Sequence, residues 1–186
     1  QIAAYVEYIA DTEKDLAEKP EDFSLLQQLG DLNAQLGNVY VNDGQTENSS
    51  AAFLKAAEYY EKSLSFLPEG LNEKGQTDIY ADIALAYWLA TGHDEQSEEN
   101  FKKGIEISPY DFPINNNYIV YLYSTKGIDS AIAQAEAYRD SLPEGNEYIG
   151  DADTLVKNLQ EIKTELQKAQ EEQNKEDENK DDKQGM

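Results

Sequence analysis

The sequence has no cysteine, one histidine and few basic residues, and each shortage excludes a class of function. Disulfides, thiolate catalysis and Cys/His metal sites are excluded, because His93 alone cannot complete a ligand set. The 186 residues hold 15 Lys and Arg against 38 Asp and Glu, a formal charge of −23. Nucleic acids and anionic membrane surfaces require a basic face, so neither is an expected partner.

Catalytic and metal-binding motifs are also missing. No segment has the spacing of a calcium-binding loop, and no Gly-rich phosphate loop or nucleophile motif accompanies the many carboxylates. His93 stands in a short turn beside Asp94, where a solvated side chain is expected. We therefore predict a protein that is not an enzyme and that has no catalytic residue, metal site or cofactor.

Apolar residues recur at spacings of three and four along almost the whole chain, which predicts an all-α fold. Glycine and proline fall between the periodic segments, where they end helices. We expect about eight helices, at residues 2–18, 22–42, 50–67, 77–91, 95–107, 114–126, 129–142 and 151–172.

The predicted helices come in pairs. The second helix of each pair ends in proline, as KAAEYYEKSLSFLP, QSEENFKKGIEISP and SAIAQAEAYRDSLP. Each has a small residue twelve positions before its proline, which lets two helix backbones approach closely. The first helices read LLQQLGDLNAQLG, YADIALAYWLATG and NNNYIVYLYSTKG.

These pairs resemble the tetratricopeptide repeat, whose 34-residue pattern is W-x2-L-G-x2-Y, then A-x3-F, then P. The first helix of the first pair carries Leu26, Leu29, Gly30 and Gly37. The spacing from Pro20 to Pro68 is fourteen residues over length, and the excess is expected between Gly37 and Ala56, with both helices extended toward the loop NDGQTENSS. The third pair departs from the pattern at Asn115, Ile119 and Leu122, so its first helix is expected to pack less closely.

The resemblance implies a right-handed α-solenoid of helix-turn-helix repeats with a C-terminal capping helix. Residues 1–20 are then an N-terminal helix forming a degenerate half repeat, and the repeats are 21–68, 76–109 and 112–143. A capping helix is expected at 148–172, where Leu155, Leu159, Ile162 and Leu166 form one stripe, and a disordered acidic tail at 173–186.

The resemblance also implies a concave groove, lined by the first helix of each pair, that binds a segment of a partner protein. Amide side chains can pair with a peptide backbone, aromatic ones can hold apolar groups, and Asp31 and Asp82 favour a cation. Residues 22–42 and 77–91 hold no Lys or Arg, which disfavours capture of acidic C-terminal tails. The predicted groove residues are Gln27, Gln28, Asp31, Gln35, Asp82, Leu85, Trp88, Asn116, Asn117, Val120 and Tyr123.

The sequence thus predicts a non-enzymatic protein–protein interaction scaffold whose partner is a neutral to basic peptide with apolar anchors. The alternative is a structural protein that assembles with its own copies through its terminal helices, whose apolar stripes are the least covered. The opening QIAAYVEYIA fits the trailing edge of a removed signal or membrane anchor and equally the first turns of a soluble helix. A membrane-anchored extracytoplasmic location and a cytoplasmic one both stay open.

Overall fold

A computed structural model describes residues 1–184, with side chains as far as Asn174, and the regular structure of this part is entirely helical. The elements are α1 (Ile2–Glu18), α2 (Phe23–Asn42), α3 (Thr46–Ser63), the short 3-10 helix η1 (Leu64–Phe66), α4 (Glu73–Leu89), α5 (Asp94–Ile107), α6 (Phe112–Lys126), α7 (Ile128–Ser141) and α8 (Ile149–Gln184). The all-α prediction is confirmed. The chain divides into two compact units between Tyr118 and Ile119, within α6.

Side-chain caps begin the first helices of the pairs, as the sequence chemistry requires. The Asp22 carboxylate accepts a hydrogen bond of 3.1 Å from the Leu25 amide, at the start of α2. The Asn72 side chain accepts one of 2.9 Å from the Gly75 amide at the start of α4. Such caps satisfy backbone donors that have no partner inside the helix. The cap at Asn72 places the start of α4 four residues before the predicted helix, inside the expected linker.

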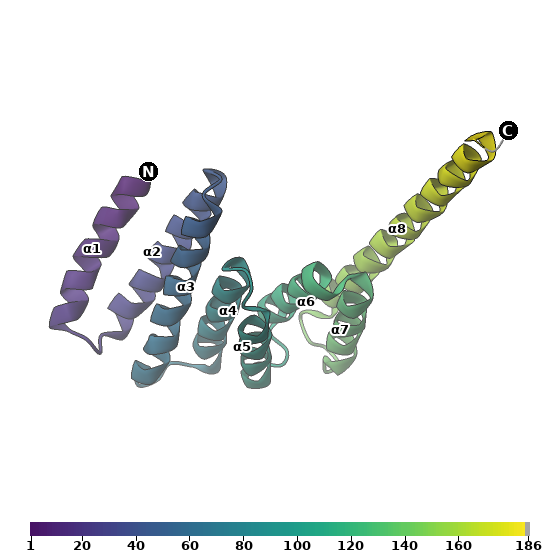
Figure 1. The fold of residues 1–186 in the computed structure, drawn as a ribbon. Helices are drawn as coiled ribbons and strands as arrows, with labels where there is room; N and C mark the ends of the chain where they lie inside the picture. Colours follow the sequence, from purple (N-terminus) through teal and green to yellow (C-terminus); the bar gives the residue numbers. More distant parts are fainter. Residues whose placement is uncertain (185–186) are drawn as a thin grey trace. The chain divides into compact units, whose positions relative to one another are not determined.

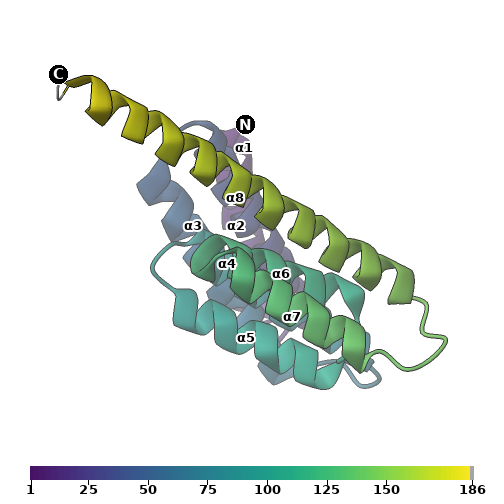
Figure 2. The ribbon, with the colours of Figure 1, turned by 90° about the vertical axis from the view of Figure 1, so that its right-hand side faces the viewer.

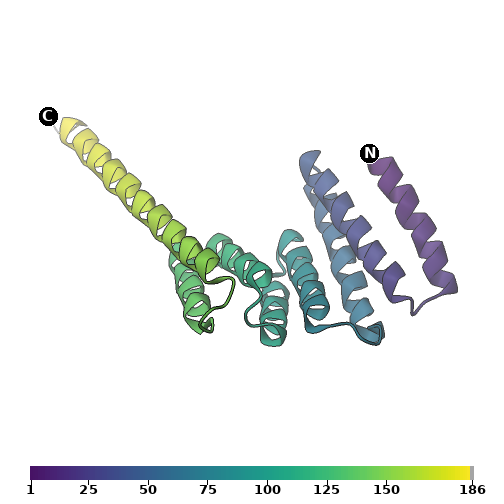
Figure 3. The same ribbon diagram turned by 180° about the vertical axis from the view of Figure 1, so that it is seen from behind.

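In the first unit, consecutive helices form antiparallel hairpins that stack side by side. Helix α2 pairs with α3 and α4 pairs with α5, while α1 lies along α2 and α3 along α4 (Figures 1 and 3). The turn between α2 and α3 is only Asp43–Gln45, with Gly44 at a φ of 72°. Helix α3 therefore begins at Thr46, and the loop expected before residue 50 is mostly helical.

Glycines in α2 permit the close approach of α3. A Cβ added at Gly30 would lie 2.3 Å from the Tyr60 ring, and one added at Gly37 would lie 2.8 Å from the Phe53 ring. Both rings are buried, at 4% and 1% exposure. Each glycine thus receives an aromatic ring from the facing helix, and the two contacts lie seven residues apart on both helices.

In the second unit, α8 lies along α7 (Figure 2). Ala131 and Ala135 of α7 pack with Val156 and Leu159 of α8, and Ile119 completes this buried cluster. The small alanines let the two helices approach, and the larger side chains of α8 fill the space between them.

Helix α8 is longer than the capping helix that the sequence suggested. It continues to Gln184, whereas a disordered tail was expected from residue 173. The tail is rich in Glu, Gln and Lys, which have high intrinsic helix propensity, so a helix already begun can continue through it. Residues 185 and 186 of the expected tail lie outside the described residues.

Candidate functional site

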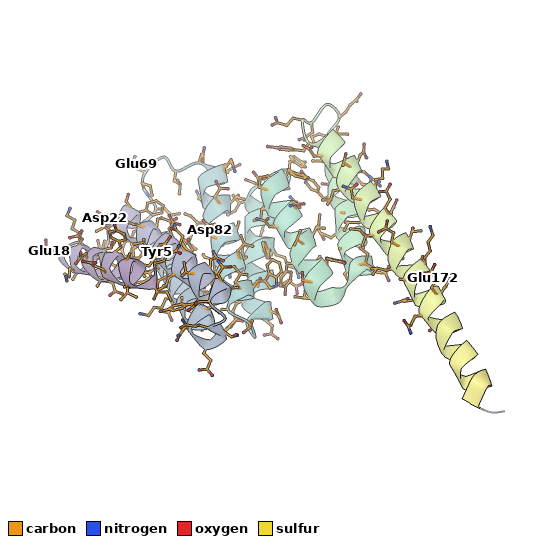
Figure 4. The ribbon with its side chains drawn as sticks, turned by 90° about the horizontal axis from the view of Figure 1, so that it is seen from above. Tyr5, Glu18, Asp22, Glu69, Asp82 and Glu172 are labelled. Atoms are coloured by element: carbon orange, nitrogen blue, oxygen red, sulfur yellow. The ribbon has the colours of Figure 1, made fainter. Side chains whose placement is uncertain are left out.

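Two carboxylates of the predicted groove, Asp31 on α2 and Asp82 on α4, lie near the Tyr60 hydroxyl on α3, and the negative charge of each raises the pKa of Tyr60. The Tyr60 hydroxyl on α3 donates a hydrogen bond of 2.7 Å to Asp31 Oδ1 on α2. Asp82 on α4 is half-buried, and the charge of Asp31 acts on it directly (Figure 4 labels Asp82). Asp31 and Asp82 are 51 residues apart in the sequence, and the packing of α3 against both α2 and α4 brings them near each other.

This pair of carboxylates is electrostatically unfavourable without a cation. Burial, together with the negative charges of Asp31 and Asp78, raises the pKa of the Asp82 carboxyl to about 7. The pKa of Tyr60 is also raised, first by burial and then by its hydrogen bond to Asp31. A positive group placed between the two aspartates would relieve this strain, because it would favour the charged form of Asp82.

Gln27 is engaged within the fold. Its side-chain amide donates a hydrogen bond of 2.6 Å to the Ser63 hydroxyl, which in turn donates to the Tyr60 carbonyl at 2.6 Å. Gln27 therefore supports the end of α3 beneath Tyr60. Gln28, one position further on, is exposed and free of such a bond.

Gln35 leads to a part of the surface that the sequence prediction missed. It is exposed, and its side-chain oxygen accepts a hydrogen bond of 3.1 Å from the Tyr5 hydroxyl of α1. Tyr5, Tyr8 and Leu32 line a hollow of about 370 Å³ together with Gln35 (Figure 4 labels Tyr5). Tyr8 is 62% exposed. The three-residue spacing of the two tyrosines was visible in the sequence, but the prediction confined the groove to the first helices.

The remaining predicted groove residues lie in α4 and α6. Leu85, Trp88, Asn116 and Asn117 are half-buried within the first unit. Val120 and Tyr123 are exposed, at 42% and 40%, and belong to the second unit. The structure therefore brings Asp31 near enough to Asp82 to raise its pKa, and it places Gln28 and Gln35 on the exposed side of α2.

Another hollow missed by the sequence prediction lies between α1 and α3, over the side of α2 that carries Asn33, Leu36 and Tyr40. Its volume is about 320 Å³, and its walls are mostly apolar. No single segment of the sequence predicts this hollow, because its lining comes from side chains of three different helices.

The part of the chain that the structure describes contains no group of His, Asp and Glu side chains able to hold a metal ion. His93 is half-buried, and its ring lies 5.7 Å from the Tyr87 ring. Among the described helices, none combines the length and the apolar character that a membrane span requires.

Two segments of the chain, residues 30–63 and 77–111, match the family profile of the tetratricopeptide repeat. The chain therefore contains two tetratricopeptide repeats, one built on α2 and α3 and one on α4 and α5, which confirms the resemblance seen in the sequence. Such repeats imply a role in protein–protein interaction, and they are typically not catalytic. The comparison with curated proteins finds no match.

The matched segment of the first repeat, residues 30–63, lies inside the predicted repeat of residues 21–68. Within this segment Leu36, Gly37 and Tyr40 read L-G-x2-Y, which places Asn33 at the tryptophan position, seven residues after Leu26. In the second segment the same pattern falls on Tyr80, Ile83, Ala84 and Tyr87. The predicted first repeat extends beyond the matched segment at residues 21–29, which include the start of α2, and at residues 64–68, which include η1.

Proposed function

We propose that this protein is a non-enzymatic interaction scaffold that binds a segment of a partner protein along the exposed side of α2 and α4. The observation that carries the proposal is that the negative charges of Asp31 and Asp82 both act on Tyr60, and that the charge of Asp31 raises the pKa of Asp82. Helix α2 has no Lys or Arg. The one lysine of α4, Lys74, lies near Asp78 and Asp111, at 2.9 and 3.4 Å.

The negative charge on the exposed side of α2 and α4 determines which partner segments can bind there. A neutral to basic segment would be drawn to it by long-range attraction, and a Lys or Arg side chain would neutralise the two aspartates. Exposed Gln28 and Gln35 offer amide groups to the backbone of an extended peptide. An acidic segment would meet only like charge, because α2 and α4 supply no free cation in the described part of the chain.

Apolar anchors on the partner would find contacts nearby. Leu85 and Trp88 of α4 are half-buried, and Tyr8 of α1 and Leu89 of α4 are more exposed, at 62% and 43%. Aromatic side chains dominate the binding energy of many interfaces because they bury large areas with few rotatable bonds.

A titration tests the proposal. Peptides with one or two Lys or Arg beside an apolar residue should change the fluorescence of Trp88, the only tryptophan, and peptides ending in acidic clusters should not. Replacing Asp31 or Asp82 by Asn should weaken binding by about 1 kcal/mol or more if either is an anchor. Glu58→Gln, on the exposed side of α3, is the matched control and should bind like the wild type. Binding of acidic peptides alone would refute the proposal.

A second candidate function is self-assembly, favoured by one observation on α8. Ile162 and Leu166 are 37% and 43% exposed and continue the stripe that Leu159 buries against α7. Sedimentation over a range of concentrations tests this. A dimer that is lost when residues 148–172 are deleted would favour assembly through α8, whereas a monomer at all concentrations would exclude it.

A further inference from the structure

The hollow between α1 and α3 exists because the first repeat lacks a large side chain at one position. The tetratricopeptide pattern W-x2-L-G-x2-Y begins with a tryptophan. The second repeat has Tyr80 there, half-buried against its core. The first repeat has Asn33, which is 2% exposed and lines the hollow. An asparagine leaves most of the space of an aromatic ring unfilled.

The neighbouring side chains do not fill that space either. Ala10 of α1 and Ala51 and Ala52 of α3 are small and stand on opposite walls. Val6, Ile9, Leu36 and the ring of Tyr40 supply the rest of the apolar lining. The resulting volume of about 320 Å³ falls within the range of small-molecule sites, which are mostly apolar with a few polar groups that fix orientation.

Asn33 provides such a polar group. Its side-chain Nδ2 donates a hydrogen bond of 2.8 Å to the Leu29 carbonyl, which fixes the amide orientation. Within the described part of the chain, the Asn33 Oδ1 accepts no hydrogen bond. In the described part of the chain no buried side-chain oxygen or nitrogen lacks a partner, so the Asn33 Oδ1 is open to the hollow, where a ligand N–H or O–H group can donate to it.

The charges around the hollow balance. Glu13 and Lys55 both line it, and the Glu13 carboxylate already accepts a hydrogen bond of 2.8 Å from the Tyr59 hydroxyl. One negative and one positive group give no preference for a charged ligand. From the missing ring, the apolar walls and the unused acceptor, we infer that this hollow binds a small neutral aromatic molecule with a ring N–H or O–H donor, of the indole or phenol class. This site is separate from the proposed peptide-binding side of α2 and α4.

Heteronuclear NMR titration of the full chain tests the inference, with indole as the probe and benzothiophene as a ring of similar shape that lacks the N–H. Indole should cause saturable shifts at the Asn33 side-chain amide and at the methyl groups of Ala10, Ala51 and Ala52. It should bind about tenfold more tightly than benzothiophene, because only indole supplies the missing donor.

Variants separate the site from general apolar association. Asn33→Leu should abolish the preference for indole, and Asn33→Trp should abolish binding of both probes by filling the hollow. If Asn33→Trp does not fold, Ala51→Leu serves the same purpose from the opposite wall. Asn100→Leu is the matched control, because Asn100 is also buried and donates to the carbonyl four residues earlier, at 2.8 Å.

Three results would overturn the inference. The first is shifts that do not saturate or that persist in both filled variants. The second is equal affinity for indole and benzothiophene in the wild type. The third is binding of a tryptophan-containing peptide at these residues without binding of free indole, which would make the hollow a protein-docking site.

Discussion

The Tyr60 hydroxyl donates to Asp31 from a ring that belongs to the packed core, so this hydrogen bond links the hairpin interior to the exposed side of α2. The bond is 2.7 Å long, and the ring that makes it lies against Gly30. The position of Asp31, and through it the charge felt by Asp82, therefore depends on how closely α2 and α3 pack.

Replacing Tyr60 by Phe removes this bond and keeps the ring. The free energy of unfolding of the variant should be about 1 kcal/mol lower than that of the wild type, because this is the usual net contribution of one hydrogen bond to stability. Urea denaturation measures the loss. The second expected effect is weaker binding of basic peptides, because Asp31 is no longer held in place. Unchanged stability and unchanged peptide affinity together would mean that the bond has no role.

Replacing Gly30 by Ala should cost more. The added Cβ would fall 2.3 Å from the Tyr60 ring, so helix or ring must shift, and overpacking of this kind costs about 1–3 kcal/mol. Thermal denaturation measures the loss. Gly150→Ala is the control, since nothing lies within 4 Å of a Cβ there, and a gain of up to about 1 kcal/mol is expected from helix propensity. Equal behaviour of the two variants would contradict the close packing.

The stability should depend on pH through Asp82. Its pKa is about 7 in the folded state, against 3.8 for the unperturbed group. Between these values the folded form keeps a proton that the unfolded form has released, so the free energy of unfolding falls as the pH rises from about 4 to 7 and levels off above. Asp31, Asp78 and Tyr60 are the titratable neighbours that contribute.

Asp82→Asn removes this dependence. The variant should be more stable than the wild type at pH 8 and should differ little from it at pH 4, as measured by urea denaturation at both values. Asp78→Asn, which keeps the buried carboxyl, should flatten the curve only in part. A wild type that becomes more stable from pH 4 to 7, with no change in the Asn variant, would contradict the assigned pKa.

The end of α8 that packs against α7 should stabilise the second unit, and the rest of α8 should not. Deleting residues 148–186 uncovers Ala131 and Ala135 and should lower the melting temperature markedly, because repeat units depend on their neighbours. Deleting only 173–186 should change it little. Val156→Ala against Leu166→Ala offers a milder comparison, since Val156 is 3% and Leu166 43% exposed. Similar effects of both truncations would contradict a capping role.

The sequence predicted the helices and their pairing well, because helix periodicity and the positions of glycine and proline are local properties. The first repeat allows two alignments seven residues apart for a physical reason. Gly30 against Tyr60 and Gly37 against Phe53 are the same small–aromatic contact, repeated one heptad apart on antiparallel helices. Either contact satisfies the pattern, and the sequence alone does not say which one matches the repeat.

The candidate site was predictable only in part. Asp31 and Asp82 could be assigned to one side because each lies on a first helix at a position away from the core. The bond from Gln27 to Ser63 and the role of Tyr5 could not be predicted, because both join residues 30 or more positions apart. The hollow beside Asn33 depends on small alanine side chains from two other helices. A space left by small side chains on separate helices does not appear as a periodic pattern in the sequence.

The central claim is that a partner segment binds on the side of α2 and α4 that carries Asp31 and Asp82. The most direct measurement is an NMR map of backbone amide shifts on titration with the tightest basic–apolar peptide from the fluorescence screen. The account predicts saturable shifts at Gln28, Asp31, Gln35 and Asp82, weakened by added salt, with little change at Glu58 and Lys62 on the exposed side of α3. Shifts centred on α3, with Asp31 and Asp82 silent, would contradict it.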